Sequence, residues 1–347
     1  MIALKSAFYK DKTMQEPKTI AFYRCNKLGD NIVAIPALYL TKKLYPNAKF
    51  VVITNEIGAN LYKNFDFIDE IVLYDGGENL PQIIDKINAD VLILSHRTSK
   101  LIILASQSKC PLIITWLHLK SLILPRFRHP KYLTKGKRRM LQSCIDLVRV
   151  INPRRFDKNF KGIALQNLPI QIKTNPQNVA FVDKFMLTGG GGYKIIIGIN
   201  AFASNANRGF AVDDYIALGE KLAREFSEIL VIFMNYKGSG YEFKAFSEPN
   251  IKVFVNDNDL LNLAELTRRL TLLLSVDTGN THLADNLGTK ILELIPAKEV
   301  YSWACGAYGN ECELVILPHN WQKRYEFYKQ VYFDKARAWV QRLLQDN

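Results

Sequence analysis

Short apolar runs rich in Val, Ile and Leu alternate with longer amphipathic stretches along most of this 347-residue chain. The apolar runs of the first half are 19–24, 49–54, 70–74, 90–95 and 111–115, and those of the second half are 194–200, 228–234, 251–255, 271–276 and 290–295. Nearly continuous apolar strands separated by helices are typical of a parallel sheet with helices on both faces. The sequence therefore predicts an α/β fold with two doubly wound domains.

The limits of these domains are predicted from changes in composition. We expect helices over 31–44, 212–226, 260–269 and 281–287. A polar stretch containing Pro and Asn, roughly 152–176, separates the halves, and four glycines at 189–192 lead into the first strand of the second half. We therefore expect one domain over 1–165 and another over 190–320, joined near residues 155–190. The aromatic-rich segment 321–347 is expected to form one or two helices that pack back across the domains.

The composition, with 48% hydrophobic and 23% charged residues, is that of a folded globular protein and excludes a disordered chain. Lys109, His118 and Lys120 interrupt the most apolar stretch, so no transmembrane helix is predicted, and no secretory signal is predicted either. Five scattered cysteines indicate reduced thiols in a cytoplasmic protein and argue against a disulfide framework. Cys305 and Cys312 lack a C-x-x-C spacing and a nearby His, so no metal site is predicted.

Two glycine-based motifs narrow the function further. The dinucleotide fingerprint G-x-G-x-x-G is missing after the first strand, where residues 25–31 read CNKLGDN. This argues against an oxidoreductase that binds a nicotinamide or flavin cofactor. The glycines at 189–192 are not followed by Lys-Ser/Thr and they precede a strand, so we interpret them as a flexible connection and not as a phosphate loop.

Asp30 lies in the turn that joins the first predicted strand to the helix after it. In a parallel sheet such a turn lies at the carboxyl edge of the strands, where ligands bind. Two interpretations of Asp30 follow from this position. It is either a helix N-cap, a role that Asp often takes, or a carboxylate general base.

A second polar group, SVDTGNTHLA at 275–284, also follows an apolar strand and begins a predicted helix. Gly279 allows a ligand to approach the backbone, and the N–H groups at a helix start favour a phosphate. Asp277, Thr278 and Thr281 offer short polar groups for sugar hydroxyls. His282 either binds the ligand or forms a hydrogen bond within the turn.

A third group follows the strand at 194–200 and contains Asn200, Ser204 and Arg208 ahead of the next helix. A cation near a helix N-terminus is poorly placed for the helix dipole. This suggests that Arg208 binds an anionic ligand such as a diphosphate, because a guanidinium suits phosphate oxygens. The alternative is a solvated surface arginine.

In these three segments the chain resembles glycosyltransferase family 9, which contains the lipopolysaccharide heptosyltransferases. The motifs are L-G-D-x5-P from Leu28 to Pro36, the Arg208 segment, and D-T-G-x-x-H from Asp277, and they follow the family order over about residues 19–296. Arg208 stands where the family has Lys, and Asn280 stands where it often has Pro.

This resemblance implies a GT-B fold, in which two Rossmann-like domains face a cleft. It also implies inverting transfer without a metal or other cofactor, with Asp30 as the general base. The C-terminal domain would bind an ADP-sugar and the N-terminal domain a lipid-linked acceptor, and Glu242 matches a family acid that binds the donor's ribose. The predicted donor-binding residues are Asn200, Ser204, Arg208, Glu242, Asp277, Thr278, Gly279, Thr281 and His282.

Positive charge is concentrated in residues 120–155, which contain eleven Lys and Arg and one acid, a net +10 of the chain's +13. Such a segment attracts anions. A nucleic-acid recognition motif is missing, so we expect a membrane surface or a phosphorylated glycolipid, helped by the apolar stretch 112–124. A solvated face is the alternative. The predicted acceptor-binding residues are Lys27, Lys120, Arg126, Arg128, Lys135, Lys137, Arg138 and Arg139.

These features predict an inner-core heptosyltransferase that lies peripherally on the cytoplasmic face of the inner membrane. It is expected to move a heptose from ADP-heptose to the 3-deoxy-octulosonic acid of a lipid A precursor. One alternative is a family 9 transferase that uses another nucleotide sugar or adds a later heptose. Another, from a different class, is a non-catalytic nucleic-acid-binding protein, suggested by charge alone.

Overall fold

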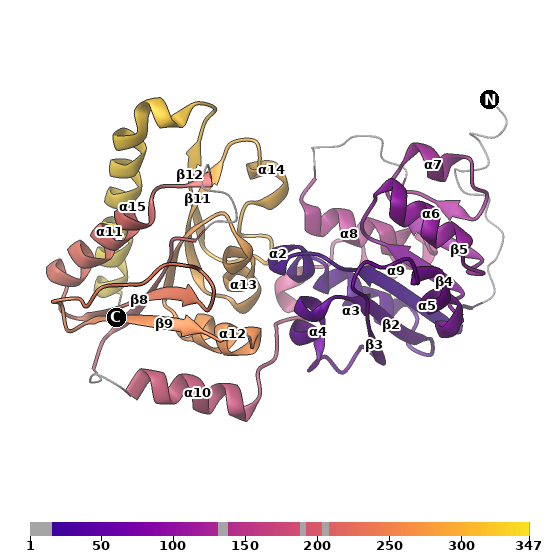
Figure 1. Ribbon diagram of the computed structural model, residues 1–347, viewed down its shortest axis with the longest axis horizontal. Coiled ribbons are helices and arrows are strands. Elements are labelled where there is room, and N and C mark those ends of the chain that lie inside the picture. Colours follow the sequence, from indigo (N-terminus) through magenta and orange to yellow (C-terminus); the bar gives the residue numbers. More distant parts are fainter. Residues whose placement is uncertain (1–15, 131–137, 188–191, 203–207, 258, 347) are drawn as a thin grey trace. The chain divides into compact units, whose positions relative to one another are not determined.

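The computed structural model describes residues 16–130, 138–187, 192–202, 208–257 and 259–346. The chain divides into two compact units, the first ending at Ile170 and the second beginning at Gln171 (Figure 1). The sequence predicts a junction near residues 155–190, and the division lies within that stretch. No helix among the described residues is both long and apolar enough to cross a bilayer.

The first unit consists of a parallel sheet and the helices around it. The strands are β1 (Thr19–Arg24), β2 (Lys49–Thr54), β3 (Glu70–Leu73), β4 (Val91–Leu94), β5 (Leu112–Thr115) and β6 (Phe127–Arg128). The helices are α2 (Leu28–Ile32), α3 (Ile35–Leu44), α4 (Glu56–Tyr62), α5 (Leu80–Ile87), α6 (Ser99–Gln107), α7 (Leu119–Leu122), α8 (Met140–Arg149) and α9 (Pro153–Phe160), with a 3-10 turn η1 (Leu165–Asn167).

The strands of this sheet run in the order β3-β2-β1-β4-β5-β6, and all their pairings are parallel. On one face, residues of β1, β4 and β5 pack against Leu80 and Ile84 of α5 and Ile102 of α6. The strand order reverses between β1 and β4, because successive strands are added on opposite sides of this pair. Ligands of doubly wound folds bind at the carboxyl end of such a reversal.

The second unit repeats this plan. Its strands are β7 (Ile195–Asn200), β8 (Ile229–Tyr236), β9 (Ile251–Asn256), β10 (Leu272–Val276), β11 (Lys290–Pro296) and β12 (Cys312–Leu317). Its helices are α10 (Pro176–Leu187), α11 (Val212–Glu225), α12 (Leu260–Arg269), α13 (Gly279–Leu287), α14 (Val300–Trp303) and α15 (Tyr325–Gln345), with a 3-10 turn η3 (Trp321–Arg324).

The second sheet has the order β12-β11-β10-β7-β8-β9, again parallel throughout, and it reverses between β7 and β10. Helices α11 and α15 cover one face, where Tyr332, Trp339 and Val340 of α15 belong to the core. The predicted C-terminal helix is therefore present. Through this core it is part of the second unit.

Several local predictions need correction. The expected helix over 31–44 is two helices, α2 and α3, and Pro36 occupies the first turn of α3, where its missing N–H has no cost. Strands β6 and β12 were not predicted. The expectation of reduced thiols is wrong for one pair, since Cys305 and Cys312 form a disulfide. Because β12 was not predicted, nothing in the sequence indicated that these two cysteines would meet.

Candidate functional site

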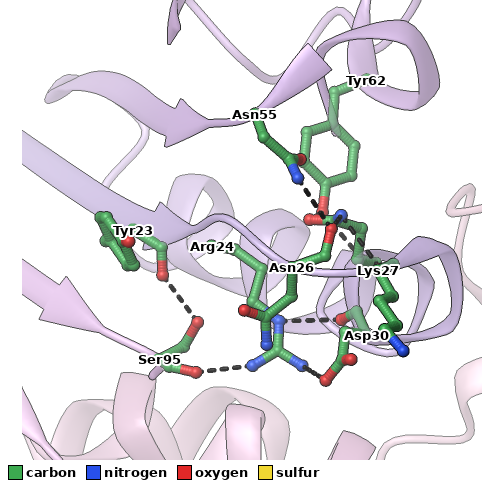
Figure 2. A network of polar contacts seen from close by, with 9 residues as sticks. Tyr23, Arg24, Asn26, Lys27, Asp30, Asn55, Tyr62 and Ser95 are labelled. Atoms are coloured by element: carbon green, nitrogen blue, oxygen red, sulfur yellow. Dashed lines mark hydrogen bonds and ion pairs between the residues drawn. The ribbon is translucent and has the colours of Figure 1, made fainter. Parts of the chain in front are cut away.

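The strand reversal of the first sheet holds a buried arginine, Arg24, which is the last residue of β1. Its Nη1 donates to the carbonyl oxygen of Ser95, just beyond β4, at 2.5 Å, and its Nη2 donates to Oδ1 of Asp30 at 2.7 Å (Figure 2). Its Nε donates to the backbone carbonyl of Asp30 at 2.9 Å. Arg24 thus ties the ends of β1 and β4 to the first turn of α2.

Asp30 is the third residue of α2, and the N-cap position is held by Lys27. The N-cap interpretation of Asp30 is therefore wrong, because its side chain is held by Arg24 instead of capping the helix. Arg24 engages one oxygen, and 26% of the Asp30 side chain remains exposed. A fixed, solvent-reachable carboxylate at a strand reversal is the arrangement that a general base needs.

Side chains from neighbouring elements fix the backbone of the turn before Asp30. The Asn31 amide donates to the carbonyls of Asn26 and Lys27, at 2.8 and 3.1 Å, and the Asn55 amide donates to Asn26 at 2.9 Å. The Tyr62 hydroxyl donates to the carbonyl of Asn31 at 2.8 Å (Figure 2). The side chain of Lys27 is exposed, so its charge is available at the edge of this turn.

His96 follows Ser95 on the other side of the same reversal, and sequence reasoning did not single it out. It is half-buried. Burial and the positive charge of Arg24 lower the pKa of its imidazole, and Asp30 acts in the opposite direction. The ring is therefore neutral at pH 7 and can donate or accept a hydrogen bond with a sugar hydroxyl.

The reversal of the second sheet joins the end of β7 to the end of β10. The buried Asn200 amide donates to the hydroxyls of Ser275, at 3.0 Å, and Thr278, at 2.9 Å. Thr278 is the N-cap residue of α13 but forms no side-chain capping bond. Because the Thr278 side chain does not cap the helix, the backbone N–H groups of Gly279 and Asn280 at the start of this nine-residue helix are placed to bind an anion.

Arg208 lies beside this helix start and is one-third exposed. Its Nη1 lies 3.2 Å from Oδ2 of Asp277, and its Nη2 lies 3.5 Å from Oε1 of Glu299. Both distances exceed the 2.7–2.9 Å or so of a strong charge-assisted bond. The two acids therefore hold Arg208 loosely, and a diphosphate can take their place as its partner.

Asp277 is buried, and burial raises the pKa of its carboxyl to about 6; Arg208 opposes this rise and Glu299 adds to it. A carboxyl whose pKa is higher in the folded than in the unfolded state makes the fold less stable as pH rises between the two values. The ionised form of Asp277 thus destabilises the second unit above about pH 6.

We expect Asp277→Asn to melt at a higher temperature than wild type at pH 7, with the difference shrinking toward pH 4. The pKa rise from 3.8 to about 6 corresponds to a gain of ~3 kcal/mol at pH 7. Thermal melts from pH 4 to 8 measure this, with Asp213→Asn, an exposed acid of the same unit, as the control. A melting difference that does not change with pH would contradict the assignment.

The other predicted donor residues differ in their accessibility. Thr281 is fully buried, and its hydroxyl bonds within the turn to Ser275 and to the carbonyl of Val276, so its proposed contact with sugar hydroxyls is wrong for this conformation. His282 is buried with its ring 5.6 Å from that of Trp303.

Glu242 is exposed beyond β8. No contact in the described part of the chain joins it to Arg208 or Asp277. Ser204 lies outside the described residues.

The basic segment proves to be only partly available for ligands. The Arg126 guanidinium donates to three backbone carbonyls, that of Arg128 donates to two, and Arg138 forms an ion pair with Asp146 at 2.6 Å. Lys120 and Arg139 are exposed. Lys135 and Lys137 lie outside the described residues.

The structure adds two surface features. Leu119, which begins α7, and Ile123, which follows its last residue, lie in the apolar stretch 112–124 that was expected to help membrane binding, and they are 80% and 82% exposed. In the second unit, the ring of Phe202 contacts those of Tyr236 and Tyr241 edge-on, at 5.9 and 6.0 Å, beyond β7 and β8. The sequence did not indicate the aromatic group, because its rings come from segments that only the fold brings together.

Comparison with known proteins gives a likeness of structure. No family model matches the sequence, and no match is found among curated proteins. A glycosyltransferase of family 9 from Veillonella parvula DSM 2008 has a TM-score of 0.70 at 17% identity, covering 95% of this chain and 98% of its own.

Two E. coli structures are also similar. ADP-heptose lipopolysaccharide heptosyltransferase II has a TM-score of 0.70 at 15% identity, covering 95% of this chain and 99% of its own. Heptosyltransferase WaaC with ADP has a TM-score of 0.64 at 13% identity, covering 94% and 99%. With two parallel six-stranded sheets that match these glycosyltransferases over most of its length, the chain has the GT-B fold.

Proposed function

We propose that this protein is an inverting glycosyltransferase that moves a heptose from ADP-heptose to the 3-deoxy-octulosonic acid of a lipid A precursor. The observation that carries the proposal is the pair of complementary strand reversals. One presents a fixed carboxylate, Asp30, and the other presents a cation, Arg208, beside an open helix start. Base and phosphate-binding groups are the two requirements of metal-free glycosyl transfer.

The second unit would bind the nucleotide sugar. The diphosphate fits the amides that begin α13 and the loosely held guanidinium of Arg208. The edge-on aromatic group of Phe202, Tyr236 and Tyr241 offers flat surface for a nucleobase. The structures of the heptosyltransferases above, one of them with ADP, support ADP-heptose as the donor.

The first unit would bind the acceptor. Asp30 removes the proton from the acceptor hydroxyl as its oxygen attacks the anomeric carbon, from the face opposite the diphosphate. The bond from that carbon to the β-phosphate oxygen breaks, and Arg208 stabilises the charge of the departing ADP. Arg24 keeps Asp30 in place by its bonds to both the carboxylate and the backbone.

The helix α7 would dock the acceptor unit on an anionic membrane. Leu119 and Ile123 project from an element that begins the basic segment, and Lys120 is exposed between them. Apolar side chains that enter the lipid and cations at its surface together give stable attachment. This arrangement supports a peripheral position on the cytoplasmic face of the inner membrane.

We expect the double variant Leu119→Ser/Ile123→Ser to lose most of its binding to vesicles of anionic phospholipid. Each lost side chain removes up to ~2 kcal/mol of apolar burial. Co-sedimentation measures the effect, and Leu187→Ser is a matched control because Leu187 is 81% exposed but lies in the second unit, outside the basic segment. Equal binding of wild type and the double variant would show that α7 does not enter the lipid.

Transfer should not depend on Mg²⁺ or Mn²⁺, because Arg208 and the helix amides take the phosphate charge that such an ion would otherwise neutralise. The measurement is the initial rate in EDTA with and without each ion. Activity that disappears in EDTA and returns with Mg²⁺ or Mn²⁺ would disprove this part of the mechanism.

The nucleic-acid alternative is tested by binding. ADP-heptose should bind saturably and lose affinity in Arg208→Ala, whereas duplex RNA should bind weakly and lose its affinity as salt rises. Tight RNA binding together with no binding of ADP-heptose would replace the proposed function by the alternative. Binding of a different nucleotide sugar would keep the transferase class and change the donor.

A further inference from the structure

Glu293, Cys305 and Cys312 meet on the face of the second sheet that α15 does not cover. Leu292 and Leu294 of β11 belong to the core with α15, so the alternate residue Glu293 points to the other face. Cys312 begins β12 in register with Ile291, and therefore lies on the same face as Glu293. Cys305 reaches this position from the connection between α14 and β12, with its Cα 6.2 Å from that of Cys312.

The three side chains offer a compact set of ligand atoms. Their two sulfur atoms and a carboxylate oxygen all lie within 4.8 Å of one another. Glu293 is fully buried and Cys305 is 3% exposed. The carboxylate faces Cys305, whose backbone N–H donates to Oε2 at 2.8 Å. A tetrahedral ion with bonds of about 2.3 Å to sulfur and about 2.0 Å to oxygen needs its ligand atoms roughly 3.5–3.8 Å apart. The two sulfur atoms are bonded to each other in the disulfide, so they must separate on reduction before they can bind such an ion.

We propose that the reduced protein binds one thiophilic divalent cation of the Zn²⁺ type through Cys305, Cys312 and Glu293, and that this ion and the disulfide are alternative states of one site. Two thiolates select such a cation over Mg²⁺ or Ca²⁺. Cys312 is only partly buried, so water can supply the fourth ligand.

Interconversion requires a two-electron reductant, such as a dithiol. The dithiol gives two electrons and two protons to the Cys305–Cys312 bond, which breaks into two thiols, and the dithiol itself becomes a disulfide. On binding the cation, both thiols release their protons to solvent, and Glu293 binds as the carboxylate.

The site adjoins the helix that begins at the second strand reversal. Asp285 of α13 accepts a bond from the backbone N–H of Ala307, at 2.8 Å, and its backbone carbonyl accepts from the Asn310 amide. The connection that carries Cys305 is thus bonded to α13 as well as to β11. A bound ion would hold this connection in place when the disulfide is absent.

Cobalt binding to the reduced protein tests the proposal. Wild type is treated with a phosphine reductant and a chelator under anaerobic conditions, desalted, and titrated with Co²⁺. We expect one Co²⁺ per chain with sulfur-to-cobalt charge-transfer absorption, displaced by Zn²⁺. The oxidised protein, with the disulfide verified by mass spectrometry, should show none of this absorption.

Variants separate the site from adventitious binding. Cys305→Ser and Cys312→Ser should each halve the charge-transfer band, and each should weaken binding by more than the roughly 10–100-fold that loss of an outer partner costs. Glu293→Gln should keep the band and weaken the affinity. Cys25→Ser, which removes the partly exposed thiol of the first unit, is the matched control and should bind as wild type does. Absence of stoichiometric cobalt binding in reduced wild type, or binding that survives Cys305→Ser/Cys312→Ser, would overturn the proposal.

Discussion

Replacing Asp30 by Ala is expected to lower the turnover number by roughly 100-fold or more, the usual contribution of a general base. The donor affinity should not change, because every group assigned to the donor lies in the second unit. Asp30 is assigned as the base because it is reachable from solvent and held in place by Arg24. Alanine has no group that could accept the proton of the acceptor hydroxyl. Steady-state rates together with the dissociation constant of ADP-heptose measure the two effects separately.

Two further variants make this result specific. Asp30→Asn keeps the size of the side chain and can still accept a bond from Arg24, so its activity should be as low as that of Asp30→Ala. Asp90→Asn is the matched control, because Asp90 is an acid of the same unit that accepts the N–H groups of Lys18 and Thr19 at the other end of β1. Near-normal turnover in folded Asp30→Ala would remove Asp30 from the mechanism.

Replacing Arg208 by Ala is expected to lower kcat by ~100–1,000-fold, the effect of removing one donor that stabilises transition-state charge. The dissociation constant of ADP-heptose should rise by less than kcat falls, since the charge on the β-phosphate is greatest as the bond breaks. Arg208→Lys should recover part of the rate, because it keeps the charge and loses the two-pronged geometry.

The Arg208 result needs a control for stability, because Arg208 also pairs with Asp277 and Glu299. Arg224→Ala removes an arginine of the same unit that pairs with Glu248, and it should leave both constants unchanged. Melting temperatures of all variants identify any loss of fold. If Arg208→Ala retains kcat of the same order as wild type, another group must bind the departing diphosphate.

Much of the fold follows from local patterns. The ten predicted strands are present because nearly continuous apolar runs between helices leave few alternatives to a buried parallel strand. Strand β6 has two residues and carries no such pattern. Strand β12 was missed because Cys312 and Glu313 begin it, and Glu313 is matched by Lys335 of α15, a partner that only the tertiary structure supplies.

The site was predictable where its residues are adjacent in the chain. Asp30, Asp277 and Gly279 lie within a few residues after the ends of β1 and β10, and turns at strand ends face the ligand edge. Arg24 was not predicted to be a site residue, because an arginine at the end of an apolar run usually indicates the start of a solvent-exposed loop. Its function depends on Ser95, 71 residues away, which only the β1–β4 pairing brings near.

The same limit applies to the charged segment and to the cysteines. The sequence shows a net positive charge. It does not show that the Arg126 guanidinium donates its hydrogen bonds to backbone carbonyls. It also places Glu293 far from Cys305 and Cys312, although the three meet in the fold. Contacts between distant segments set which charges are free for a ligand and which are used internally.

The most direct test of the proposed activity is identification of the product. Purified protein is incubated with a lipid A precursor bearing 3-deoxy-octulosonic acid. ADP-heptose or one of a panel of other nucleotide sugars is added to each reaction, one donor at a time. Asp30→Ala is the parallel control. Mass spectrometry should show the acceptor gaining one heptose from ADP-heptose and no gain with the variant, and NMR of the product should show inverted anomeric configuration. Transfer of a different sugar would refute the assigned donor, and no transfer from any donor would contradict the proposed activity itself.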